Sequence, residues 1–173
     1  MAEDQAPQAP KSNGAPDRGD LPQISILAQY VKDLSFENPN SPNIYQIKEP
    51  PAIDVQFNIG NSQTSDDVWE VQLKIEVTAK SQEQTAFVVE LAYAGLFGIR
   101  NVPQAQMQPF LLVDAPSILF PYARRILADA VRDGNFPALM LEPIDFGSLY
   151  MQQQAQMAQG GSDNVDLPPT GNA

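Results

Sequence analysis

The acidic pair Asp66 and Asp67 is the nearest approach to a catalytic constellation in this sequence, since two carboxylates can divide acid and base work between them. Adjacent residues at the start of a strand point to opposite sides, however, so we interpret the pair as part of a solvated turn. The chain contains no histidine and no cysteine, which removes the usual general base, the commonest metal ligand and the thiol nucleophile. Gly95 and Gly98 lack the third glycine and the lysine of a phosphate-binding loop. The sequence predicts no enzyme, no metal site and no cofactor.

The charge balance narrows the choice of partners. The chain carries 10 basic and 21 acidic residues, a net charge of -11 at pH 7. Nucleic acid and anionic membrane surfaces would be repelled, so a basic partner fits better. No apolar run is long enough to cross a bilayer, and the first residues lack the apolar core of a secretion signal. We therefore expect a soluble, cytoplasmic protein that neither inserts into membranes nor binds nucleic acid.

Alternating apolar and polar residues predict the elements that must position any binding site. They mark strands over about 24–37, 53–59, 69–79 and 85–93, the last two forming an antiparallel hairpin. Lys32 interrupts the apolar side of the first run, which favours a bulge there. The stretch from Glu37 to Ala52 is too rich in proline for a helix or a central strand, and it predicts a long connection between the first two strands.

Helical periodicity follows the strands. Residues 117–134 carry a wide apolar stripe, with Gly134 expected in the left-handed conformation that stops the helix. Asp145 is the expected N-cap of a second helix ending near Gln159. The segment Gly95–Ile99, with a glycine at each side of its apolar centre, is interpreted as a loop.

These elements predict the α+β class, a four-stranded antiparallel sheet packed with two helices. The long helix has more apolar surface than one sheet face can cover, which favours a homo-oligomer. The composition of residues 1–22 predicts a disordered arm, and that of residues 160–173 a disordered tail. On the polar side of the fourth strand, Val88 and alanines surround Glu90. Extra packing, a subunit contact and a partner site all remain open for that side.

Several segments together resemble the bacterial protein-export chaperone family SecB. They recur in order over about residues 24–155 and are Lys32–Asn40, Asp66–Val71, Thr85–Phe87 with Glu90, Ile118–Arg124, and Asn135–Pro137 leading to Pro143 and Phe146. Residues 23–159 are then the SecB-like domain.

The resemblance implies an ATP-independent holdase. Such a chaperone binds unfolded precursor proteins in the cytoplasm, keeps them competent for translocation, and delivers them to the motor protein SecA of the Sec export pathway. It also implies the long crossover between strands 1 and 2, and a homotetramer built as a dimer of dimers with the long helices between two larger sheets. Two alternatives stay open: a SecB-like chaperone for another client, such as an antitoxin, and a structural oligomer without a client groove.

Two sets of site residues follow from the resemblance. The SecA-binding residues carry over as Asp33, Glu37, Val88 and Glu90. The client-binding residues are expected to line an apolar groove, and they are Ile44, Tyr45, Ile53, Val55, Phe57 and Tyr150. The alternative for Ile53, Val55 and Phe57 is that they belong to the ordinary inner face of the sheet.

Overall fold

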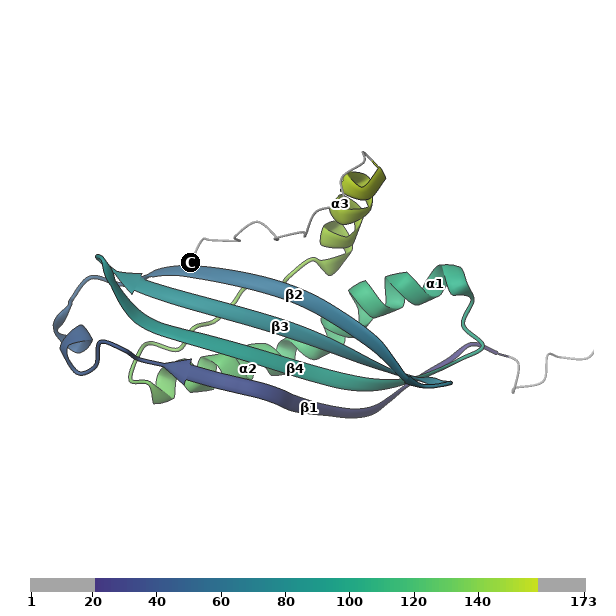
Figure 1. The fold of residues 1–173 in the computed structure, drawn as a ribbon, viewed down its shortest axis with the longest axis horizontal. Coiled ribbons are helices and arrows are strands. Elements are labelled where there is room, and N and C mark those ends of the chain that lie inside the picture. The colour runs from purple at the N-terminus through teal and green to yellow at the C-terminus, as the bar shows by residue number, and fades with distance from the viewer. Residues whose placement is uncertain (1–20, 159–173) are drawn as a thin grey trace, which may run out of the picture.

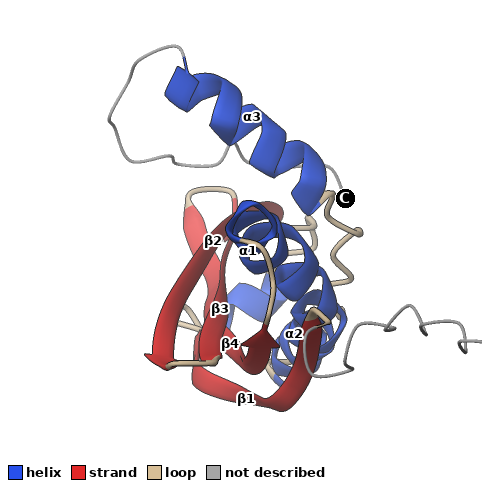
Figure 2. Ribbon diagram, turned by 90° about the vertical axis from the view of Figure 1, so that its right-hand side faces the viewer, coloured by secondary structure: helices blue, strands red, loops and turns tan. Residues whose placement is uncertain are grey.

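A computed structural model describes residues 21–158 and shows one antiparallel sheet with helices against one of its faces (Figures 1 and 2). The sheet has four strands in the order β1-β4-β3-β2, so β1 and β2 form its edges. The strands are β1 (Gln23–Glu37), β2 (Ala52–Ser65), β3 (Val68–Ser81) and β4 (Gln84–Arg100). The predicted α+β fold is confirmed. The arm and tail expected over 1–22 and 160–173 lie outside the described residues, except for residues 21 and 22.

The predicted crossover joins the two edges of the sheet. Between the end of β1 and the start of β2 the chain contains only the short 3-10 helix η1 (Asn43–Gln46). The side chain of Ile44 anchors this segment, because it is buried in the core with 3% of its surface exposed. The crossover thus packs against the domain although its prolines exclude a longer regular element.

The core lies between the sheet and the long helix α2 (Ala115–Asp133), which Figure 2 shows beside the strands. On β3 the apolar residues alternate with polar ones, and Leu73, Ile75 and Val77 are fully buried on the helix side. Leu119 and Leu127 of α2 are buried against them. Each such side chain contributes roughly 1.5–3 kcal/mol on burial, so this layer fixes which face of the sheet looks outward.

The chain reaches α2 through α1 (Gln104–Pro109) and the π-helical turn η2 (Phe110–Asp114), and the described part of the chain ends with α3 (Phe146–Ala158). Asp145 caps α3 as predicted, accepting a hydrogen bond from the Ser148 backbone N–H at 2.9 Å. In Figure 2, α3 stands apart from the sheet beyond α1.

Two expectations about glycines were wrong. Gly95–Ile99 is not a loop but part of β4, paired with both β1 and β3. A side chain on Gly95 would lie 2.9 Å from the Leu119 Cδ2 atom, so this glycine allows close packing rather than a turn. The left-handed residue after α2 is Asn135, with φ 63°, whereas Gly134 has φ -73°. Gly134 is required instead by the Phe36 ring, which would lie 2.2 Å from a Cβ atom there.

Candidate functional site

The bulge predicted near Lys32 is present, and it determines which β1 side chains face away from the helices. The pairing of β1 with β4 shifts between Val31 and Asp33, so one extra residue of β1 is accommodated there. Without that residue Asp33 would lie opposite Leu91, whose side chain is in the core. With it, Asp33 lies opposite Ala92 on the outer face.

The same register brings together the four residues expected to bind SecA. Glu37 lies opposite Val88, and Ser35, between Asp33 and Glu37, lies opposite Glu90. All four residues therefore project from the outer face of two neighbouring strands, away from α2. We call this face the acidic face, defined by Asp33, Glu37, Glu90 and the additional Glu76.

Glu76 was not among the site residues predicted from the sequence. The alternation of the third strand could have indicated it, because Glu76 is one of the polar residues on the side of that strand opposite its apolar residues. It lies directly opposite Glu90 across β3 and β4, and Gln56 of β2 follows it in the same row. Within residues 21–158, none of the four carboxylates of the acidic face lies within ion-pair distance of a basic side chain. Like charges placed opposite one another repel, so this arrangement favours a cationic partner.

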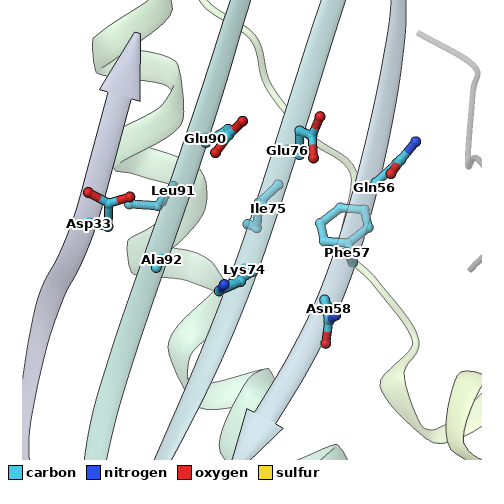
Figure 3. Close-up of a pocket in the computed structure, with 10 residues that line it drawn as sticks. All are labelled: Asp33, Gln56, Phe57, Asn58, Lys74, Ile75, Glu76, Glu90, Leu91 and Ala92. Atoms are coloured by element: carbon cyan, nitrogen blue, oxygen red, sulfur yellow. The ribbon is translucent and has the colours of Figure 1, made fainter. Parts of the chain in front are cut away.

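A hollow of about 250 Å³ opens on this face (Figure 3). Asp33, Glu76 and Glu90 contribute its carboxylates, and the small side chain of Ala92 leaves room between them. Lys74 is the one basic residue among the described residues that line it. The hollow is large enough to accept a lysine or arginine side chain from another protein.

One ion pair borders the acidic face. The Lys32 Nζ atom lies 2.6 Å from Glu70 Oε2, and the Tyr30 hydroxyl donates to Glu70 Oε1. These two donors, the lysine first, lower the pKa of the Glu70 carboxyl below its ordinary value. The bond to Glu70 raises the pKa of Tyr30 to about 12. Only 14% of the Glu70 side chain is exposed, so the carboxylate is a fixed acceptor.

A second hollow of about 100 Å³ lies at the β2 edge, between β2 and α3, and it shares the lining residues Phe57 and Asn58 with the first hollow. It brings together Phe57 and Tyr150, two of the expected client-binding residues. Ile59, Leu112, Phe146 and Leu149 complete its apolar lining. The arrangement offers an apolar side chain a place beside the edge of the sheet.

The other expected client-binding residues occupy different environments. Ile44 and Val55 are 3% and 5% exposed and belong to the core, and Ile53 packs against it half-buried. Tyr45 is 42% exposed, and its hydroxyl donates to the Gly134 carbonyl oxygen at 2.9 Å. Of the six expected client-binding residues, Tyr45, Ile53, Phe57 and Tyr150 therefore keep some exposed surface, whereas Ile44 and Val55 are buried.

Other kinds of site find no support in the described part of the chain. Residues 21–158 contain no group of three or more carboxylate, histidine or cysteine side chains that could hold a metal ion. No helix among them is long and apolar enough to cross a membrane.

The antiparallel sheet carries helices on one face, an acidic surface without ion pairs on the other, and an apolar hollow between β2 and α3. This arrangement belongs to the class of folds suited to binding other polypeptides. The family model described as preprotein translocase subunit SecB matches residues 17–157, and the chain belongs to this family. It is 66% identical over 136 residues to the protein-export protein SecB of Rhizorhabdus wittichii, covering 79% of this chain and 82% of that relative.

Two further comparisons agree with this family assignment. The protein-export protein SecB of Zymomonas mobilis is 64% identical over 140 residues, which are 81% of this chain and 85% of that relative. A solved SecB-like chaperone of Mycobacterium tuberculosis, in complex with a peptide of the HigA1 antitoxin, superimposes with a TM-score of 0.59 at 16% identity. That match covers 70% of this chain and 90% of the solved one, and it shows a shared fold.

Proposed function

We propose that the chain is an ATP-independent holdase of the cytoplasm that binds unfolded precursor proteins, keeps them competent for export and delivers them to SecA. The observation that carries this proposal is the acidic face, where Asp33, Glu37 and Glu90 come together without a counter-ion among the described residues. A basic segment of the motor would be attracted there, and the attraction would weaken with salt. The mechanism uses binding alone, with neither catalysis nor a cofactor.

The client is assigned to the hollow at the β2 edge, beside α3. The hollow lined by Phe57 and Tyr150 accepts an apolar side chain, and Ile53 and Tyr45 extend the apolar surface toward the crossover. One anchor of this kind contributes roughly 1.5–3 kcal/mol before ordering costs, so a single contact is weak and reversible. Several anchors on one unfolded chain raise the avidity without selecting a sequence. Client and motor are thus assigned to different sets of residues, apolar ones beside α3 and acidic ones on the outer face of the sheet.

Assembly into a homotetramer, a dimer of dimers, is part of the proposal. Within the described residues no strand pairs with the outer edge of β1. Along this strand large apolar side chains are close to half exposed, which is more than an isolated edge strand tolerates in solution. They are Ile24, Ile26, Leu27, Val31 and Leu34. Tyr122 of α2, 50% exposed, adds a further apolar surface for a second copy.

The proposed division between the two faces can be tested with one triple variant. D33N/E37Q/E90Q removes three of the four charges of the acidic face but none of the apolar groups near α3. We expect it to lose SecA binding while still suppressing the aggregation of an unfolded precursor. Retained SecA binding would overturn the assignment of the motor site. If the intact chain suppresses aggregation but does not bind SecA, the alternative of another client, such as an antitoxin, takes the place of export.

A further inference from the structure

We propose that Glu70 is a positioning residue for the acidic face: it holds the ammonium group of Lys32 away from Asp33 and so keeps a second cation, in addition to Lys74, off the docking surface. This inference rests on the proposed binding of a basic segment at that face. Glu70 would not touch the partner. It would act through Lys32, by pairing with the one basic residue that the bulge places beside the acidic face.

The bulge creates the need for such a residue. Because the register shifts between Val31 and Asp33, the extra residue Lys32 and its neighbour Asp33 share the position opposite Ala92. At a bulge of this kind two consecutive side chains lie near the same face of the sheet. A lysine has a flexible four-carbon stem, so the ammonium of Lys32 has a carboxylate within reach on its own strand. Bound there, it would cancel one charge of the acidic face.

Glu70 provides the competing acceptor. It lies on β3 opposite Leu96, further along the sheet from Ala92, and it draws Lys32 Nζ to 2.6 Å. The Tyr30 hydroxyl holds its second carboxylate oxygen, so the acceptor is already oriented. Asp33, by contrast, has no ion-pair partner within residues 21–158. The structure thus shows Lys32 paired away from the hollow, whose three carboxylates have one basic neighbour, Lys74, and form no ion pair within residues 21–158.

A simpler account makes the Lys32–Glu70 pair only a clamp that holds β1 to the sheet. The two accounts predict different behaviour when the lysine is removed. If the pair is a clamp, K32Q and E70Q break the same bond and lower stability alike, and E70Q weakens peptide binding no more than E83Q, which also removes one acidic charge but lies away from the hollow. If Glu70 sequesters a competing charge, E70Q releases the lysine onto the acidic face, whereas K32Q removes the competitor altogether.

The test measures binding of a short lysine-rich peptide and of purified SecA to the full-length chain by titration calorimetry. We expect E70Q to weaken peptide binding about fivefold, equivalent to about 1 kcal/mol of lost attraction. K32Q should bind at least as tightly as the unmodified chain, and K32Q/E70Q should recover that affinity although it also lacks the ion pair. A double variant as weak as E70Q, or a K32Q as weak as E70Q, would overturn the inference.

The peptide separates this inference from the proposed function. If the affinities of the variants for the peptide follow the expected order but SecA binds neither the intact chain nor any variant, the proposed function fails while the role of Glu70 stands. If SecA binds and responds to E90Q, but both ligands are indifferent to E70Q, the role of Glu70 fails while the proposed function stands. Melting temperatures of E70Q and K32Q/E70Q should be alike, because both lack the same pair.

Discussion

Glu76 and Glu90 face each other across the two central strands, and within residues 21–158 neither forms an ion pair, although Lys74 lines the same hollow. Two like charges in register cost stability, so their presence in the middle of a sheet indicates a use outside the folding of the chain. The partner proposed here, a basic segment of SecA, would relieve the repulsion on binding. Stability and binding should therefore respond in opposite directions when one of these charges is removed.

The first prediction follows from this opposition. E76Q should raise the free energy of unfolding by about 0.5 kcal/mol, since it removes a like-charge cross-strand pair, and it should weaken SecA binding. Urea denaturation and titration calorimetry measure the two effects. E83Q is the matched control, because Glu83 is an equally exposed acid in the turn between β3 and β4, away from the hollow. A loss of stability in E76Q would contradict the repulsion argument.

The second prediction concerns the contact between α2 and β1. G134A should lower the free energy of unfolding by about 1–3 kcal/mol, because the new methyl group overlaps the Phe36 ring and forces repacking. G60A is the control, since a Cβ atom at Gly60 meets nothing within 4 Å. Combining G134A with F36L should restore part of the loss. Equal effects at the two glycines would show that the Phe36 contact is not the cause.

The third prediction is the pH dependence of the Lys32–Glu70 pair. The folded state lowers the pKa of Glu70, so its contribution to stability is fully present above the unfolded value, about 4.3, and is lost as the pH falls through the folded value. The difference in melting temperature between the intact chain and E70Q should therefore shrink on going from pH 7 toward pH 3. Comparing the two proteins at each pH cancels the titration of the other acids. A difference that grows in acid would reverse the assigned direction.

The fourth prediction separates the client surface from the rest of α3. Y150S should reduce the suppression of precursor aggregation, because Tyr150 lines the apolar hollow, and it should leave SecA binding unchanged. M151S on the next residue is the control, since Met151 is exposed and does not line the hollow. Light scattering of a diluted, unfolded precursor reports the effect. Equal losses in both variants would place the client surface elsewhere on α3.

Much of the fold was predictable because local pattern and tertiary environment agree. Three sequence features each predicted a correct element: the alternation of the third strand predicted β3, the prolines predicted the crossover, and the polar Lys32 on the apolar side of the first strand predicted the bulge in β1. The predictions from two glycines were wrong for a physical reason. Gly95 and Gly134 are required because side chains distant in sequence, Leu119 and Phe36, pack against them, and not because the chain turns there. Sequence alone shows that a glycine can turn a chain, but not what packs against it.

The candidate sites were predictable to different degrees. The resemblance supplied Asp33, Glu37, Val88 and Glu90, and the register groups them on one face. The Lys32–Glu70 pair was not predicted, because it spans two strands whose order in the sheet is not encoded in any local motif. The sequence left open whether Val55 belongs to the core or to a groove and placed Ile44 in the groove, since an apolar residue in an edge strand or a loop suits both; the structure buries the two side chains in the core.

The measurement that tests the central claim most directly is the aggregation of a chemically unfolded precursor in the presence of the purified chain, without nucleotide, together with the native mass of that chain. The account predicts a tetramer that suppresses aggregation at stoichiometric concentration. A well-folded oligomer that leaves aggregation unchanged would contradict it, and would favour a structural protein without a client groove.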